Sequence, residues 1–333
     1  MAAGAMPAAA PGMSMDAAPL RFGGVFGGSR AIETARTLER LGFDFVADGE
    51  HVMRGMPPQP SDAALVSLAA VAGATAHVRL LTAAVLTPLY HPVWLAKLAT
   101  TVDVVSGGRL TLGIGVGGEH PKEFAALGVP VKERGARTDE CLEALRRLWT
   151  QDHVVYRGRH FSFEDVSIVP RPVQRPHPPI WVTGRKESAM RRAARLGDGW
   201  LPMFYTPKQY SDSVSRIRAF ADRSGRDLTG FGWGVFLFGT MDPSREESAR
   251  IAAAGLGKNF LSGDRGWAAM VGAYCLLGSA HDWIVRLREY VDAGARHFLI
   301  GWIGRPEDQD RLIRATAEEV IPALRAEERR RVR

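Results

Sequence analysis

Apolar and polar positions alternate with two different periods along this chain. Short apolar runs, typical of buried strands, are followed by longer stretches in which apolar residues recur every three or four positions, as in an amphipathic helix. Strand-like runs occupy residues 21–26, 43–48, 78–86, 109–117, 179–184, 199–204, 231–240 and 297–302. Helical patterns occupy residues 29–41, 62–76, 91–108, 133–150, 186–196, 207–223, a segment from about 243, 280–293 and 306–326.

This order predicts an α/β fold with a parallel sheet, because a helix between two strands returns the chain in the same direction. Eight such units favour a closed TIM (β/α)8 barrel over an open doubly wound sheet. Residues 151–177 interrupt the alternation with clustered aromatic residues and a proline-rich return, so we expect an inserted hairpin after the fourth βα unit. We predict one domain over residues 20–326, with a disordered leader at 1–19 and a basic tail at 327–333.

Composition narrows the class of protein. The net charge is +7, but the arginines are scattered, and neither zinc-finger spacing nor an RRM motif occurs, so we expect no nucleic-acid partner. The two cysteines, Cys141 and Cys275, lie far apart, which fits a reducing cytoplasm. No run of eighteen apolar residues is present, so we expect no membrane-spanning segment.

Candidate chemistry lies where the predicted strands end, since functional groups of a TIM barrel gather at the carboxyl ends of its strands. Glu50 and His51 follow the second strand, and Glu119 and His120 follow the fourth. A histidine there suits proton transfer near neutral pH, although a locally hydrogen-bonded structural histidine is the alternative. The spacing of these residues is not that of zinc ligands, so we expect no metal centre.

The end of the fifth strand has the composition of an anion site. Gly184 is followed by Arg185, Lys186 and Ser188 where a helix is expected to begin. Free backbone N–H groups and nearby cations both favour a phosphate there, whereas an ordinary helix start with surface charges is the alternative. We find no GxSxG motif, so acyl chemistry has little support.

Several stretches together resemble the bacterial luciferase-like superfamily, which includes luciferase-like monooxygenases and F420-dependent oxidoreductases. They are "LGFDFVADGEHV", the segment from "LLTAAVLTPLYHP" through "GVGGEHPKEFAALGVPVKERGARTDE", "PPIWVTGRKESAMRRAARLGDGWLP" and "YVDAGARHFLIGW". The likeness spans residues 21–326 and is densest between 78 and 204. It implies a TIM-barrel enzyme that uses a flavin or deazaflavin.

The resemblance also implies roles for individual residues. A non-prolyl cis peptide in the third strand, at Ala83-Ala84 or Ala84-Val85, would press on the cofactor ring. Further cofactor contacts would come from the backbone of Gly117 and Gly118 and from the phosphate-binding residues Gly184, Arg185, Lys186 and Ser188. His51 and Glu119 would be the catalytic proton carriers. One departure is Val116, where luciferase-type monooxygenases often carry an arginine, and Arg185 or Lys186 would substitute for it.

The same resemblance leaves two reactions open. One is monooxygenation of a small apolar organic substrate with O2 and reduced FMN, supplied by a separate flavin reductase. The other is hydride transfer between coenzyme F420 and an organic substrate. A flavin-binding protein without catalysis is the alternative from another class. We expect a homodimer, a mobile lid at 255–278 and a substrate pocket that includes Glu50, Phe204, Trp233 and Trp302.

Overall fold

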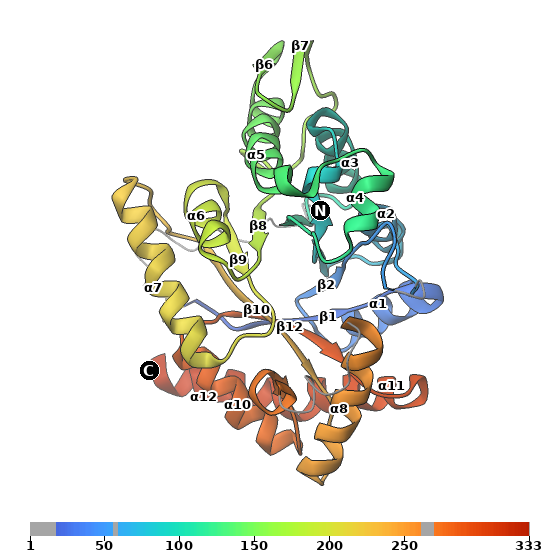
Figure 1. The fold of residues 1–333 in the computed structure, drawn as a ribbon. Helices are drawn as coiled ribbons and strands as arrows, with labels where there is room; N and C mark the ends of the chain where they lie inside the picture. Colours follow the sequence, from blue (N-terminus) through green and yellow to red (C-terminus); the bar gives the residue numbers. More distant parts are fainter. Residues whose placement is uncertain (1–17, 56–58, 261–269, 333) are drawn as a thin grey trace.

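A parallel β-barrel forms the centre of the protein (Figure 1). The computed structural model describes residues 18–55, 59–260 and 270–332. Within these residues, eight strands pair in the cyclic order β1-β2-β3-β5-β8-β9-β10-β12, and β12 pairs with β1 to close the barrel. They are β1 (Arg21–Val25), β2 (Phe45–Asp48), β3 (Arg79–Thr82), β5 (Leu110–Gly115), β8 (Ile180–Thr183), β9 (Gly199–Leu201), β10 (Gly232–Gly239) and β12 (His297–Trp302). The TIM-barrel prediction is confirmed.

Helices surround the barrel, and a hairpin projects from it. The helices are α1 (Ala31–Arg40), α2 (Ala64–Ala74), α3 (Pro92–Val105), α4 (Pro121–Ala126), α5 (Arg134–Thr150), α6 (Glu187–Leu196), α7 (Pro207–Arg223), α8 (Arg245–Phe260), α10 (Ala280–Asp292), α11 (Pro306–Ala315) and α12 (Ile321–Val332). The predicted insertion is the antiparallel pair β6 (Val154–Arg157) and β7 (Ser162–Val166), which extends beyond α5 in Figure 1.

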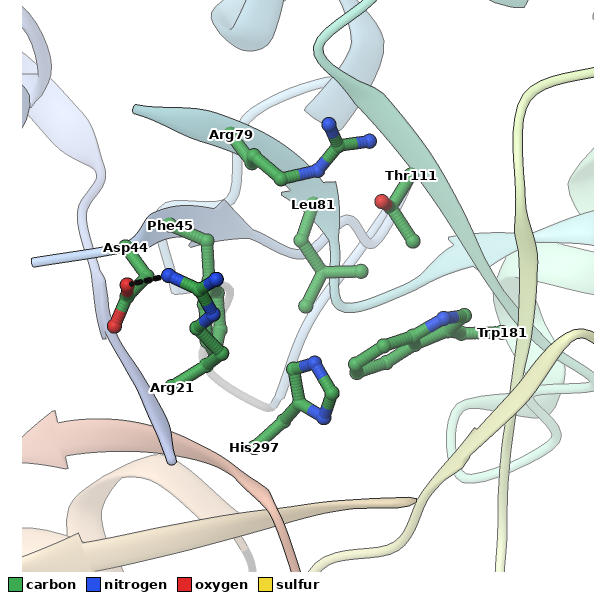
Figure 2. Close-up of a pocket in the computed structure, with 8 residues that line it drawn as sticks. All are labelled: Arg21, Asp44, Phe45, Arg79, Leu81, Thr111, Trp181 and His297. Atoms are coloured by element: carbon green, nitrogen blue, oxygen red, sulfur yellow. Dashed lines mark hydrogen bonds and ion pairs between the residues drawn. The ribbon is translucent and has the colours of Figure 1, made fainter. Parts of the chain in front are cut away.

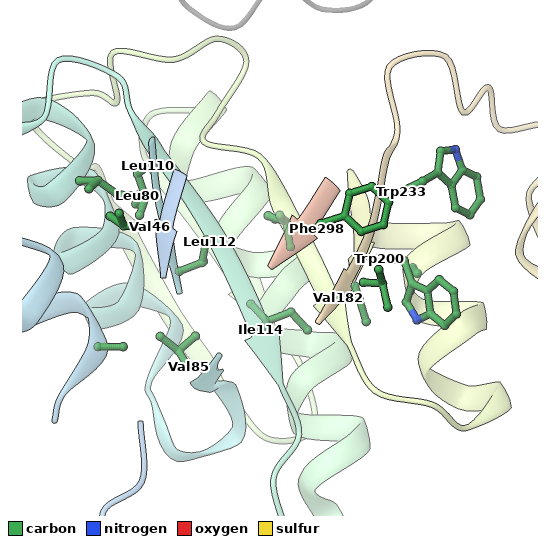
Figure 3. Close-up of a cluster of buried hydrophobic side chains, with 14 of the residues drawn as sticks. Val46, Leu80, Val85, Leu110, Leu112, Ile114, Val182, Trp200, Trp233 and Phe298 are labelled. Atoms are coloured by element: carbon green, nitrogen blue, oxygen red, sulfur yellow. The ribbon is translucent and has the colours of Figure 1, made fainter. Parts of the chain in front are cut away.

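The strands are apolar on both faces because each lies between the barrel interior and the helices. Along β5, Leu110, Leu112 and Ile114 pack outward in the large core cluster shown in Figure 3. Inward-facing side chains form a second cluster inside the barrel, made up of Phe45, Ala47, Leu81, Trp181, Leu201 and Leu299. Burial on both faces fixes the register, since a shift by one residue would exchange the two sets.

The third strand is interrupted at the place that the sequence indicated. Strand β3 ends at Thr82, and the short β4 (Val85–Leu86) resumes pairing with β5. A cis peptide bond joins Ala83 to Ala84, which confirms the first of the two predicted positions. The helix after this segment begins at Pro92, as expected.

The ends of the chain and the expected lid differ in part from the predicted boundaries. Helix α12 continues to Val332, and an Arg331–Asp292 ion pair at 2.5 Å ties it to α10, so the chain has no separate tail at 327–332. Residues 1–17 of the expected leader lie outside the described residues, as do residues 261–269 of the expected lid, whose first part is the end of α8. No helix of the described chain is long and apolar enough to cross a membrane.

Candidate active site

His51, just beyond strand β2, is held by a buried carboxylate. Its Nδ1 lies 3.2 and 3.3 Å from the two carboxylate oxygens of Glu123, whose side chain is fully buried. The same carboxylate accepts the backbone N–H of Val52 at 3.1 Å. Because Glu123 can only accept when ionised, it favours the His51 tautomer with a proton on Nδ1. Nε2 is then the ring nitrogen left for proton exchange.

The loop after β5 brings a second histidine to the first. The His120 ring lies with its centre 4.9 Å from that of His51, at an interplanar angle of 77°. Gly118 has φ +111°, and its Cα packs so closely on Arg134 that an added Cβ would lie 2.8 Å from Nε. A side chain at position 118 would therefore be strained and would displace Arg134. The side chain of Glu119, by contrast, is exposed.

Glu50 is buried inside the protein rather than turned toward a substrate. Its carboxylate accepts the Leu86 N–H at 2.9 Å, the Ala64 N–H at 3.3 Å and the Tyr90 hydroxyl at 3.0 Å. Burial raises the pKa of Glu50 despite these donors. The carboxylate links β4 to the start of α2, so Glu50 positions the segment after the cis peptide, and we do not retain it as a substrate contact.

Small side chains gather where β4, β5 and β8 meet inside the barrel. A Cβ added at Gly115 would lie 3.5 Å from the Ala84 Cβ and 3.2 Å from the Thr183 hydroxyl oxygen. Ala84, Gly115 and Thr183 thus border one another across three strands. Side chains of this size leave the backbone of the Ala83–Ala84 segment accessible to a flat group more readily than bulky ones would.

The predicted phosphate turn lies at the amino end of α6. Gly184 has φ +111°, and its carbonyl accepts the Trp200 indole N–H at 3.0 Å. The Arg185 carbonyl accepts the Tyr205 hydroxyl at 2.8 Å. The side chains of Arg185, Lys186 and Ser188 are exposed, and the Arg185 guanidinium also donates to the Phe204 carbonyl at 3.5 Å. This turn therefore combines a fixed backbone with exposed cationic groups beside a helix N-terminus.

The predicted aromatic contacts divide into two groups. Phe204 follows β9, has φ +54° and stacks on Phe238 at 5.4 Å between ring centres. Trp233 and Trp302 are instead directed outward from the barrel. Trp233 contacts Phe231, and the Trp302 indole donates to the Thr316 hydroxyl at 3.0 Å. We therefore do not retain these two tryptophans as substrate contacts.

Sequence reasoning overlooked Glu123. It emphasised Glu119, which directly precedes His120, whereas the carboxylate that contacts His51 lies four residues later, in the first turn of α4. The available signal was the spacing Glu119-His120-Pro121-Lys122-Glu123, in which the proline starts a helix and turns the second acid inward. Within the described residues, no group of three or more His, Cys, Asp or Glu side chains could hold a metal ion.

Comparison with known protein families identifies the chain. The profile of the luciferase-like monooxygenase family matches residues 6–319. The chain belongs to this family. Luciferase-like proteins are enzymes, and this chain is an oxidoreductase of the type that uses a flavin or F420.

Some relatives of the chain are named as FMNH2-dependent enzymes and others as F420-dependent enzymes. FMNH2-dependent dimethylsulfone monooxygenase of Pseudomonas putida is 29% identical over 66% of this chain and 60% of its own length. F420-dependent glucose-6-phosphate dehydrogenase of Nakamurella multipartita is 28% identical over 92% of this chain and 97% of its own. The crystal structure of monooxygenase RslO1 from Streptomyces bottropensis has a TM-score of 0.77 and 27% identity, covering 91% of this chain and 99% of that one.

Proposed function

We propose that this luciferase-like protein is a monooxygenase that uses reduced FMN and O2 to oxidise a small apolar organic substrate. The observation that carries the proposal is the likeness to monooxygenase RslO1 over nearly the whole of both chains. The name of the Pseudomonas putida relative, an FMNH2-dependent monooxygenase, supports the same reaction. When bound, reduced FMN would supply the two electrons that activate O2.

The residues at the carboxyl end of the barrel fit such a cofactor. The small side chains around Gly115 leave room for a flat ring against the backbone of Ala83, Ala84 and Val85. The backbone of Gly117 and Gly118 would border it from the next loop. Gly184, Arg185, Lys186 and Ser188 would hold the phosphate, because their turn offers a helix N-terminus and exposed cations.

We assign His51 the role of moving a proton at the substrate or the ring. Glu123 fixes its Nδ1 and so leaves Nε2 to exchange the proton. Phe204 would supply apolar contact for the substrate, since its ring is stacked and fixed by Phe238. Glu119 remains the candidate for a second proton carrier, and its exposed side chain would need the bound substrate to cover it.

Hydride transfer with coenzyme F420 is the second candidate function. It is favoured by the length of the match to the F420-dependent dehydrogenase, which covers 97% of that relative. Val116 also favours it, because luciferase-type monooxygenases often carry an arginine at the matching position. The same turn at Gly184 would then hold the F420 phosphate, and His51 or Glu119 would move the proton.

Two protein partners follow from the proposal. A separate flavin reductase would supply reduced FMN. A second copy of this chain would cover the apolar surface of α2 and α3, where Val66, Trp94 and Val105 are 67%, 59% and 57% exposed. Trp94 and Val105 are eleven positions apart and thus share one face of α3. Light scattering on the purified protein would detect the homodimer.

The reaction can be tested with purified protein, chemically reduced FMN and labelled oxygen. We expect FMN to bind and one atom of 18O to appear in the product when a panel of small apolar compounds is supplied. F420 binding with substrate-dependent absorbance change and no oxygen uptake would establish the second candidate instead. Binding of either cofactor without turnover on the whole panel would contradict both reactions.

A further inference from the structure

A small cavity lies at the amino-terminal end of the barrel, opposite the candidate active site (Figure 2). Its inner volume of about 20 Å³ suits a water molecule or a small ion. Its polar lining comes from the first inward-facing positions of four strands and a neighbouring loop: Arg21, Asp44, Arg79, Thr111 and His297.

The cations around this cavity outnumber the anions. Asp44 is the one carboxylate in the lining, and it is shared between Arg21 at 2.7 Å and Arg325 at 2.6 Å. Arg79 donates at 2.9 Å to Gln174, which is neutral. Gln174 donates its own Nε2 hydrogen to Asp103, so Asp103 bonds to the amide and acts on the Arg79 guanidinium only through its charge, which offsets part of the effect of burial on the pKa of Arg79.

Two polar atoms of the lining are left unsatisfied. Arg79 Nε and His297 Nδ1 are both buried without a hydrogen-bond partner. Burial and the nearby charges of Arg21, Arg79 and Arg296 lower the pKa of His297 to about 4, against an opposing contribution from the Trp233 carbonyl. An unsatisfied buried donor in a native protein commonly indicates a bound water or ion. Here the surrounding charge selects between them, because positive potential favours an anion over water.

We propose that this cavity binds a small monovalent anion, of the size of chloride or formate, between the guanidinium groups of Arg21 and Arg79. The anion would offset the repulsion of the two arginines and accept a hydrogen bond from His297 when its ring is protonated. The site is independent of the cofactor, since the full depth of the barrel separates it from His51.

The wild-type protein provides the first test. Crystals soaked in sodium bromide should show an anomalous peak in the cavity, in contact with Arg79 or Arg21. In NMR titrations of the His297 ring, chloride should raise its pKa by about one unit or more relative to the much larger anion gluconate. A cavity that holds only water in bromide, with equal His297 titrations in the two salts, would overturn the proposal.

Matched variants provide the second test. Arg79→Gln removes the charge and should abolish the chloride-dependent shift of the His297 titration. Lys208→Gln removes one charge from an 84% exposed side chain on α7 and should leave the shift unchanged. An Arg79→Gln protein that keeps the full chloride effect would overturn the assignment. If Arg79→Gln does not fold, the bromide and NMR results on the wild-type protein decide the question.

Discussion

The two ends of the barrel each present a histidine to charged neighbours, with opposite electrostatic consequences. At the carboxyl end, His51 faces the buried carboxylate of Glu123 and is partly exposed, with 24% of its side chain accessible. At the amino end, burial, together with the charges of Arg21, Arg79 and Arg296, lowers the pKa of His297 to about 4. The first histidine thus has an acidic side chain as its neighbour, whereas the second has three cationic ones.

The difference shows that position in the barrel does not by itself make a histidine functional. Both residues lie next to a strand terminus, and both are inside or beside the barrel. What distinguishes them is the partner on Nδ1: a carboxylate in one case, no partner in the other. Of these two histidines, His51 is the one with a carboxylate on Nδ1, and on that ground we propose it as the proton carrier.

Replacing His51 should have the largest effect on turnover. We expect His51→Ala to lower kcat by about 10²–10⁴-fold, the usual contribution of a general acid or base. The fold should persist, because the Val52 N–H still bonds to Glu123. Steady-state kinetics and circular dichroism would measure the two effects. The control is His153→Ala, in a side chain 80% exposed on the hairpin, and a His51 variant as active as this control would remove His51 from the mechanism.

The roles of Glu123 and Glu119 can be distinguished by replacing each of them with glutamine. Glu123→Gln should lower kcat about tenfold to a hundredfold, because the amide no longer fixes the Nδ1 proton, as loss of a histidine's supporting partner does elsewhere. Glu123→Asp should restore part of that loss. The 15N shifts of the His51 ring report the tautomer independently of activity, and we expect them to change only in Glu123→Gln.

The outcome for Glu119→Gln decides between two roles for that residue. A change below twofold would make Glu119 a solvated side chain, as its exposure suggests. A larger loss than that of Glu123→Gln, with unchanged His51 shifts, would make Glu119 the proton carrier. Glu318→Gln, in an exposed side chain of the turn before α12, is the control for the loss of one surface charge.

The two ends should also respond oppositely to acid. Burial, together with the charges of Asp62 and Glu50, raises the pKa of Asp48 from 3.8 to about 6. The folded state then binds more protons than the unfolded state between pH 4 and 6, so the free energy of unfolding falls as pH rises through that window. For His297 the folded state binds fewer protons between pH 6.5 and 4, so the free energy of unfolding falls as pH decreases.

Each of these contributions is on the order of 3 kcal/mol, and in the wild type they offset one another. Asp48→Asn should therefore stabilise the protein at pH 7 and leave it steeply sensitive to acid. His297→Gln should show the reverse trend, with stability that declines from pH 4 to 6. Urea unfolding at half-unit steps of pH measures both. Parallel stability curves for the two variants would show that neither group titrates as described.

The order of elements was accessible from the sequence, and so were the candidate positions at the strand ends, because both depend on local patterns. Period-two and period-3.6 hydrophobicity places the eight strands, and the strand ends then nominate His51 and Gly184. The direction of individual side chains was not accessible. Whether Glu119 or Glu123 reaches His51 depends on how α4 turns after Pro121. A strand that is buried on both faces gives no sequence signal of whether an aromatic side chain points into the barrel or toward the helices.

Trp302 tests this last point with the smallest expected effect. Its indole packs against Phe43 and donates to Thr316 on the helix side of β12, so Trp302→Phe should lose one buried hydrogen bond and some volume. We expect the free energy of unfolding to fall by about 1–2 kcal/mol, with kcat and KM within about twofold of the wild type. Phe204→Ala, at the carboxyl end of the barrel, should instead raise KM for an apolar substrate. A change in KM with unchanged stability in Trp302→Phe would place this tryptophan in the substrate site. The side chains of β12 that point toward the helices would then not be purely structural.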